Sequence, residues 1–491
     1  MSLRRTACRV LASLLCAAWA AAFATEAAPA LQPCRVPGLR NEVMCGQVQR
    51  PLNPAQPDGV QIDVHYVLLP ALARRKLPDP VFLLAGGPGQ SAIDVAPSVL
   101  PLFTRLNNRR DIVFVDQRGT GRSAPLNCED TRTQSVASQS DPQQQFTQLV
   151  ACRDALQKLP YGDLRFFTTP LAMQDLDAVR RQLGAARINL VGASYGTRAA
   201  LDYQRQFPEA VRRSVLDGVA PPDMVLPESS GADSQAVLQA LFGACEHEPD
   251  CTRLYPQLRA EWSALRNSLP RSVTLVHPLS GRPETFTLTN DMLMAAVRGP
   301  LYAPAIASAL PLAIHEAAQG RMQALVSLSS ALSPGKRGAV AMGMHFSVVC
   351  AEDAPRMKQA VDVPGSESGG DGERLYRRVC AAWPRGEVPA PFYSLPPARS
   401  PVLLLSGGLD PATPPRHAAQ VAQRLGDQAR HVVVANAGHG VMGVGCMGDV
   451  MQRFIELPDD AAALALNTDC AKDVPRPPAF EPLTPRPEAT R

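Results

Sequence analysis

Short apolar runs that alternate with turn and helix signals constrain the fold of this chain more than any other feature. Four runs have the length of buried strands, and each is followed by glycines, a turn or a helical pattern: 81–85, 112–116, 188–193 and 401–407. Weaker runs of the same kind are 214–219 and 431–435. Residues 60–69 alternate as in an antiparallel edge strand, and residues 169–184 repeat apolar side chains at helical spacing. The alternation predicts an α/β fold with a mostly parallel central sheet flanked by helices.

The strand and helix alternation is interrupted between residues 221 and 395. This stretch contains two helical patterns and an expected hairpin, at 234–245, 258–269 and 273–289. We therefore expect residues 25–220 and 396–472 to form one core, and residues 221–395 to be a mostly helical cap inserted over the sheet. Segments 129–145 and 362–373 are expected to be polar or flexible loops. The proline-rich tail, 473–491, is expected to be disordered.

The first 24 residues have the features of a cleavable signal peptide. Arg4 and Arg5 precede a short apolar stretch, and the A-x-A pattern at 22–24 supplies a cleavage site. The apolar stretch is too short to span a membrane comfortably, and no later segment reaches the roughly 20 apolar residues that a spanning helix requires. We expect a secreted or periplasmic protein that is not embedded in a membrane.

Cysteine usage agrees with export. Without Cys8 and Cys16 of the signal peptide, ten cysteines remain, and an even number in an exported chain indicates disulfides. Grouping neighbours along the chain predicts the pairs 34–45, 128–152, 245–251, 350–380 and 446–470. Two of these cysteines flank His247 in CEHEPDC, which could instead be a metal loop. In an oxidising compartment we expect these cysteines to pair, and we expect no metal site.

The charge distribution gives no sign of a nucleic-acid partner. The net charge is +4, and the basic residues are scattered, with no run of Lys or Arg interleaved with aromatics. The sequence leaves the oligomeric state open.

The strongest chemical signal lies at residues 188–208. Gly192, Ser194 and Gly196 form G-x-S-x-G, the nucleophile elbow, between an apolar strand and a helical pattern. A serine in a strained strand-to-helix turn needs neighbours without side chains, so that its hydroxyl is accessible. We predict that Ser194 is a nucleophile.

A nucleophilic serine needs a base, and a third group must hold that base. In the hydrolase order the acid and then the histidine follow the serine, each in a loop after a later strand. Asp410 and His439 follow the apolar runs 401–407 and 431–435, and of the eight histidines only His439 has that setting. We predict Asp410 as the acid and His439 as the base, with Asp217 and Asp116 as rival acids.

Residues 81–92, VFLLAGGPGQSA, allow two interpretations. Gly87, Gly89 and Ala92 match the dinucleotide-binding pattern G-x-G-x-x-A, and Asp116 ends the next apolar run, where a ribose-binding acid would stand. The alternative is an oxyanion hole, in which glycines let backbone N–H groups approach a developing negative charge.

We expect the oxyanion hole. Pro97 and Pro101 disfavour the uninterrupted helix that a dinucleotide fold needs after this loop. An exported, cysteine-rich chain is also an unexpected place for a soluble nicotinamide enzyme, so no cofactor is expected. The N–H donors would be those of Tyr195 and Gly87, with Gly86 as the alternative to Gly87.

With these residues assembled, the chain resembles exported α/β-hydrolase serine peptidases of the prolyl and tripeptidyl aminopeptidase family, and it is more similar to the tripeptidyl branch. The resemblance covers most of the mature chain and is carried by CGQVQRPLNPAQPDGVQIDVHYVLLPA, GGPGQS, DIVFVDQRGTGRS, VGASYGT, VVCAED, PVLLLSGGLDPATP and AGHG. It implies Ser194, Asp410 and His439 as the triad. Prolyl relatives have histidine where this chain has Ala85, which counts against a close match to that branch.

The resemblance also implies a substrate. Such aminopeptidases hold the free α-amine of a peptide with acidic groups near the cap, and the VVCAED match makes Glu352 and Asp353 the candidates. The expected function is a serine exopeptidase that releases short peptides, tripeptides above all, from free N-termini. Two alternatives remain: an esterase or other acyl hydrolase with the same triad, and an inactive hydrolase fold that serves as a binding protein.

Overall fold

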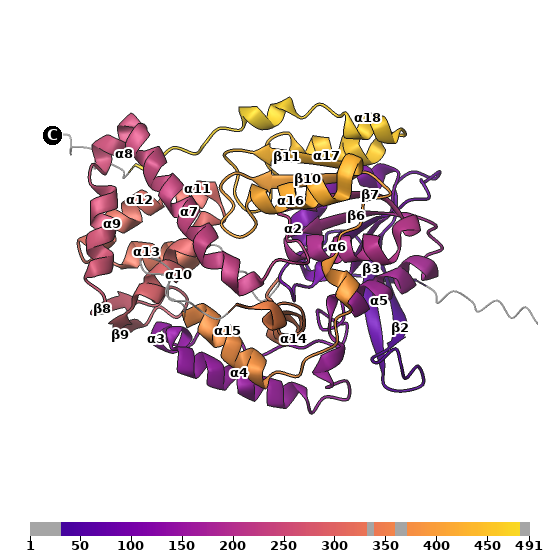
Figure 1. Cartoon of the computed structure of the whole chain (residues 1–491), viewed down its shortest axis with the longest axis horizontal. Helices are drawn as coiled ribbons and strands as arrows, with labels where there is room; N and C mark the ends of the chain where they lie inside the picture. The colour runs from indigo at the N-terminus through magenta and orange to yellow at the C-terminus, as the bar shows by residue number, and fades with distance from the viewer. Residues whose placement is uncertain (1–30, 331–337, 359–370, 482–491) are drawn as a thin grey trace, which may run out of the picture.

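The computed structural model describes residues 31–330, 338–358 and 371–481 (Figure 1). In these ranges nine strands form one sheet, in the order β1-β2-β3-β5-β4-β6-β7-β10-β11. Their bounds are β1 (Gln32–Cys34), β2 (Val43–Pro51), β3 (Gln61–Leu69), β4 (Val81–Leu84), β5 (Ile112–Val115), β6 (Ile188–Ala193), β7 (Val211–Asp217), β10 (Val402–Gly407) and β11 (Ala429–Val434). All six apolar runs therefore fall on strands that pair in parallel, and the predicted α/β fold is confirmed.

The expected edge strand has a different place. β3 is antiparallel, as predicted, but it lies between β2 and β5 and is not at the edge. Its Val64, Tyr66 and Val67 are buried, because β2 and β1 continue the sheet beyond it. The run that forms β2 contains Gly46 and ends at Pro51, so its apolar pattern is too weak to indicate a strand.

Side chains alternate along the central strands and build a core on each face of the sheet. One core joins Phe82 and Leu84 of β4 to three helices, α5 (Thr169–Gln182), α6 (Tyr195–Gln206) and α16 (Pro415–Leu425). The other joins Val81 and Leu83 to α2 (Ala92–Phe103) and α17 (Met447–Glu456). Because parallel strands are covered on both faces, their sequences are apolar throughout, and their carboxyl ends remain open for loops.

The two prolines after the glycine loop do not prevent a helix. Pro97 and Pro101 both lie inside α2. The helix begins at the cap residue Ser91, whose hydroxyl accepts the N–H of Asp94, and its Phe103 packs into the core. Anchoring at both ends outweighs the hydrogen bonds that the prolines remove. The proline argument against a nucleotide fold was therefore wrong.

The insertion 221–395 divides into two parts. Its first part has a core of its own, apart from the sheet (Figure 1), and its elements are α7 (Leu226–His247), α8 (Pro249–Leu254), α9 (Leu258–Asn267), the hairpin β8 (Arg271–Val276) and β9 (Pro283–Leu288), α10 (Asn290–Leu301), α11 (Pro304–Ala307), α12 (Leu310–Ala318) and α13 (Gln323–Ser330). We call this part the cap. The helices α14 (Met342–Glu352) and α15 (Asp371–Ala382) instead pack into the core of the sheet. Helix α15 packs on α4 (Pro142–Leu156), and the disulfide Cys350–Cys380 joins α14 to α15.

One of the two expected loops contains helices. Segment 129–145 contains α3 (Val136–Ser140) and the start of α4 (Pro142–Leu156), where Asp141 accepts the N–H groups of Gln143 and Gln144. Its polar composition reflects exposure, not the absence of a helix. Segment 362–373 falls mostly outside the described residues, and its end forms the first turn of α15.

The described part of the tail is bound to the rest of the chain. The Asn436 side chain donates to the carbonyl of Val474. The Phe480 N–H donates to the carbonyl of Ser308, and the Phe480 carbonyl accepts the hydroxyl of Tyr255, both in the cap. The expected disorder therefore does not hold up to residue 481, because these bonds tie the segment to both core and cap.

All five predicted disulfides are confirmed. The pair Cys245–Cys251 excludes a metal loop built on those thiols. In the described ranges no helix is both long and apolar enough to cross a bilayer. The expected signal peptide, residues 1–24, lies outside them.

Candidate active site

Ser194 occupies a strained turn between β6 and α6. Its φ of 55° is positive, a conformation that non-glycine residues rarely adopt. The flanking glycines make this turn possible: a Cβ on Gly192 would lie 2.5 Å from the carbonyl oxygen of Gly196, and a Cβ on Gly196 would lie 2.1 Å from that of Leu84. The G-x-S-x-G spacing thus lets α6 start directly against the end of β4, with the side chain of Ser194 partly exposed.

Replacing Gly196 by alanine is expected to lower kcat by about 10²-fold, because the added methyl meets backbone that cannot move aside and displaces the nucleophile. Steady-state kinetics and the temperature of unfolding measure the effect. Gly443→Ala is the matched control, since a Cβ there would meet only the Leu102 side chain, at 3.7 Å. Equal kcat in the two variants would contradict this interpretation of the elbow.

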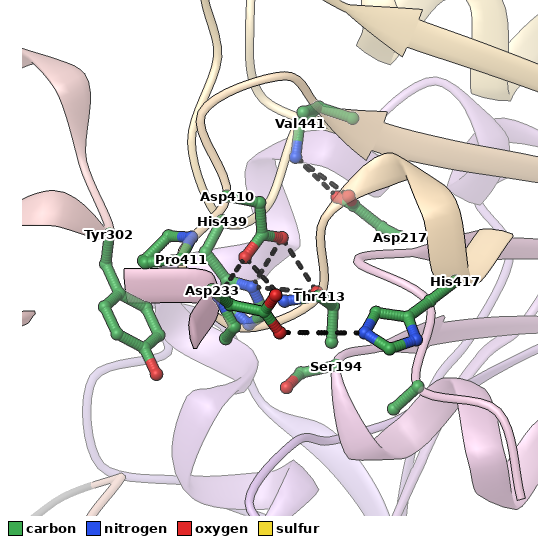
Figure 2. A network of polar contacts seen from close by, with 12 residues as sticks. Ser194, Asp217, Asp233, Tyr302, Asp410, Pro411, Thr413, His417, His439 and Val441 are labelled. Carbon is green, nitrogen blue, oxygen red and sulfur yellow. Dashed lines mark hydrogen bonds and ion pairs between the residues drawn. The ribbon is translucent and has the colours of Figure 1, made fainter. Parts of the chain in front are cut away.

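Asp410 and His439 are brought together, as predicted, from the loops after β10 and β11 (Figure 2). The His439 Nδ1–H donates to Asp410 Oδ2 at 2.8 Å. Asp410 is completely buried, whereas 17% of the His439 side chain is exposed. This geometry fixes the tautomer of His439, so that its other nitrogen, Nε2, is free to accept a proton.

The Asp410 carboxylate is held by more than the histidine. Oδ1 accepts the N–H groups of Ala412 and Thr413, each at 2.8 Å, and Oδ2 accepts the Thr413 hydroxyl at 2.8 Å. Burial raises the pKa of Asp410, but His439 and these donors lower it more, so that the net shift is downward. For His439, burial lowers the pKa, but the Asp410 carboxylate raises it more, so that the net shift is upward from 6.5.

These shifts predict an acid limb in the pH profile. A general base must be neutral to accept a proton, so kcat/KM is expected to fall as the pH drops through the raised pKa of His439. The midpoint should lie above 6.5, the ordinary value for histidine. Initial rates across the pH range measure it, with a reference spectrum to confirm folding at each pH. An undiminished kcat/KM at pH 5 would contradict His439 as the base.

Ser194 and His439 are held by consecutive residues. The Ser194 N–H donates to the carbonyl of Asp217 at 2.8 Å. A Cβ on the next residue, Gly218, would lie 3.2 Å from Cε1 of His439. Figure 2 accordingly shows Ser194 in the same cluster as the Asp410–His439 pair. The structure therefore places Ser194, His439 and Asp410 near one another at the carboxyl ends of the strands, and their catalytic roles stay predictions.

The glycine loop after β4 also lies at the nucleophile. A Cβ on Gly86 would be 3.3 Å from Cβ of Ser194 and 2.9 Å from the Gln90 side chain. Gly87 has φ of 114°, and a Cβ there would meet the backbone nitrogen of Gly89 at 2.6 Å. Gly87 therefore requires glycine, and the absence of a Cβ at Gly86 lets the backbone of the loop lie close to Ser194.

Asp116, the rival acid, holds two backbone segments together and is not bonded to His439. Its carboxylate accepts the Ser91 hydroxyl at 2.6 Å, the Ile93 N–H at 3.1 Å and the Arg122 N–H at 3.2 Å. It is buried and ties the start of α2 to the loop after β5. A carboxylate occupied in this way cannot hold a ribose, and this replaces the proline argument against a nucleotide site.

Glu352 and Asp353 are completely buried against Arg198. The Glu352 carboxylate accepts the N–H and hydroxyl of Thr169, and Arg198 donates to Asp353 at 3.1 Å. Burial raises the pKa of Glu352 to about 8 and that of Asp353 to about 6. To bind an ammonium group they would have to exchange partners. Their expected amine-binding role stays a prediction.

Three residues at the site were not predicted in the roles that they have. The Thr413 hydroxyl donates to Asp410, and the Asp217 carboxylate accepts a backbone N–H of the loop after His439. The backbone carbonyl of Tyr302, in the cap, accepts the backbone N–H of His439 at 2.8 Å. The ring centroids of Tyr302 and His439 lie 5.1 Å apart. A hydroxyl three residues after Asp410 is a recognisable turn signal. No sequence signal links Tyr302 to His439, because the contact exists only once the cap is folded.

Comparisons with known proteins point to the same fold. A family model described as "alpha/beta hydrolase fold" matches residues 79–293, and one described as "TAP-like protein" matches residues 371–463. A tripeptidyl aminopeptidase of Streptomyces lividans is 32% identical over 222 residues, 42% of this chain and 41% of that protein. The serine protease Hip1 of Mycobacterium tuberculosis is 29% identical over 209 residues, 39% of each chain. A carboxylesterase B of Mycobacterium tuberculosis is 27% identical over 442 residues, 78% of each.

The match with the first two relatives is partial, since the chain spans only about two fifths of their length. The matched segments nevertheless include the nucleophile elbow in one family model and the acid and base in the other. The chain has the α/β-hydrolase fold, and over part of its length it is similar to a tripeptidyl aminopeptidase and a serine protease.

Proposed function

We propose that this protein is an exported serine exopeptidase that releases tripeptides from the free N-termini of peptides. The observation that carries the proposal is the Asp410–His439 hydrogen bond of 2.8 Å beside the strained Ser194 elbow. The tripeptidyl aminopeptidase and serine protease relatives support a peptide substrate. Five disulfides support an oxidising, extracytoplasmic location.

The chemistry follows from the positions of the three side chains. Nε2 of His439 takes the Ser194 proton as Oγ attacks the scissile carbonyl, and Asp410 stabilises the imidazolium that forms. The histidine then gives the proton to the leaving amine, which leaves an acyl-enzyme on Ser194. Water, deprotonated by the same histidine, hydrolyses this ester and releases the short N-terminal peptide. In each half of the reaction His439 takes a proton from the attacking oxygen and gives it to the leaving group.

Backbone N–H groups of Tyr195 and Gly87 would stabilise the oxyanion. Tyr195 begins α6, so its N–H belongs to the unsatisfied first turn of a helix. The glycine loop packs against Ser194 from the other side. Each such donor contributes about 10²–10³-fold to turnover in serine hydrolases.

The cap supports an exopeptidase. It contacts His439 through Tyr302, and we expect it to restrict access to the site. Peptides and unfolded termini could enter where a folded protein could not. Glu352 is linked to Tyr195, the residue after the nucleophile, because the Thr169 hydroxyl bonds both the Glu352 carboxylate and the Tyr195 hydroxyl. We propose that Glu352 and Asp353 accept the substrate ammonium group.

An acyl hydrolase acting on esters is the second candidate. The relative named carboxylesterase B aligns over more of the chain than the peptidases do, and a serine triad does not itself choose between ester and amide.

A panel of chromogenic substrates separates the two candidates. It contains a tripeptide anilide with a free amine, its N-acetylated form, single amino-acid anilides and a short-chain nitrophenyl ester. We expect rapid cleavage of the free tripeptide anilide and a large loss on acetylation. Cleavage of the ester alone, or indifference to acetylation, would overturn the exopeptidase in favour of the esterase. Ser194→Ala controls for contaminating hydrolases.

A further inference from the structure

Asp217 bonds both the backbone of Ser194 and the loop that follows His439. It is the last residue of β7 and is buried, with 2% of its surface exposed. Its carbonyl oxygen accepts the N–H of the nucleophile, Ser194, at 2.8 Å. Its carboxylate accepts the N–H of Val441 at 2.8 Å (Figure 2) and that of Met442 at 2.8 Å. One residue therefore holds the backbone of the nucleophile and the loop that follows the base.

The carboxylate of Asp217 does not replace Asp410. The His439 Nδ1 is bonded to Asp410, and the oxygens of Asp217 are bonded to backbone on the far side of the histidine loop. Because Asp217 is buried beneath that loop, it does not contact a substrate in the cleft. Its influence on the reaction must pass through Ser194 and His439.

The negative charge of Asp217 also acts on the histidine. Burial raises the pKa of Asp217 to about 6, while the Val441 and Met442 N–H groups and His439 oppose the increase. Together with Asp410, the Asp217 carboxylate raises the pKa of His439. Arg298, on α10 of the cap, is the charged group that lowers the pKa of His439, and the Tyr302 ring also faces it.

We propose that Asp217 is a positioning residue that sets the distance between Ser194 and His439 and supplies a second negative charge to the imidazolium formed during the reaction. The charge favours the protonated histidine, which exists only after the serine proton has moved. Asp217 therefore stabilises the transition state more than the resting enzyme. This role holds for an ester as well as for a peptide substrate, so it goes beyond the proposed function and does not depend on it.

The test is Asp217→Asn, which retains an acceptor oxygen and removes the charge. We expect kcat to fall about 10- to 100-fold with KM nearly unchanged, since an amide presents an N–H₂ group to one of two backbone donors. We also expect the acid limb of the pH profile to move to lower pH, because loss of the negative charge lowers the pKa of His439. The rate of labelling by a fluorophosphonate probe should fall in parallel. That rate needs the activated Ser194 but no peptide binding, so it stays informative if the peptide specificity is wrong.

Asp202→Asn is the matched control. Asp202 is a buried carboxylate on α6 with only 1% exposed, and its partners are the neighbouring Arg205 and Gln206. It should keep kcat, KM and the acid limb. If Asp217→Asn keeps the wild-type labelling rate and acid limb, the proposal is overturned. An equal loss in both variants together with an equal drop in unfolding temperature overturns it as well, in favour of a purely structural role.

Asp217→Glu covers the case in which the asparagine variant does not fold. It retains the charge but lengthens the side chain, so the supporting result is a reduced kcat with an unchanged acid limb. A wild-type kcat in this variant would show that the distance from Asp217 to the Val441 and Met442 backbone does not matter, and would overturn the positioning role.

Discussion

Replacing Asp410 by asparagine is expected to reduce kcat by about 10⁴-fold. The His439 Nδ1–H donates to Asp410 Oδ2 at 2.8 Å, and an amide at this position no longer fixes that tautomer or stabilises the imidazolium. The acid limb should also move to lower pH, since Asp410 is the largest cause that raises the pKa of His439. Kinetics on the free tripeptide anilide measure both effects.

The asparagine variant at Asp217 is the natural comparison for this experiment. Both carboxylates are buried at the ends of neighbouring strands, but only Asp410 bonds the imidazole. The loss at Asp410 should exceed the loss at Asp217 by about 100-fold or more. Near-normal activity of Asp410→Asn, with a large loss at Asp217, would reverse the two roles.

Replacing Ser194 by alanine is expected to lower kcat by about 10⁶-fold. The remaining activity would come from the oxyanion hole and substrate binding alone. The substitution removes only the hydroxyl, and alanine meets the same positive φ of 55° as serine. The fold should therefore be retained, as judged by circular dichroism and the temperature of unfolding.

Fluorophosphonate labelling is the control for this variant. Wild-type protein should incorporate one probe at Ser194, and the alanine variant none. Retained labelling, or activity within tenfold of wild type, would show that another nucleophile carries the reaction and would contradict the assignment of the elbow.

Local signals explain why much of the fold and the triad could be predicted. The strands β4, β5, β6 and β10 are buried on both faces, so each shows as a nearly continuous apolar run bounded by glycines and turns, whereas β7 and β11 show weaker runs. Because such strands end at one edge of the sheet, Ser194, Asp410 and His439, each placed after a strand, could be expected to meet. The five disulfides followed from neighbours along the chain.

Contacts between distant segments explain what could not be predicted. The antiparallel strand β2 is half-exposed and gains its order by pairing with β3. Helix α2 forms across two prolines because capping and packing hold it. Helices α14 and α15 follow the cap in sequence but contribute apolar side chains to the core that the sheet shares with α5 and α6. The links from Tyr302 and Asp217 to the histidine loop leave no periodic or motif signal, since a backbone carbonyl or a buried carboxylate acquires its partner only in the folded chain.

The most direct test of the account is the product pattern from an unmodified peptide. A peptide of seven residues with a free N-terminus and its N-acetylated twin are incubated with the protein, and the products are identified by mass spectrometry. We predict that the free peptide loses its first three residues as one fragment, and that the acetylated twin stays intact under conditions where Ser194→Ala leaves both intact. Equal cleavage of the two peptides, or cuts at internal positions only, would contradict the central claim.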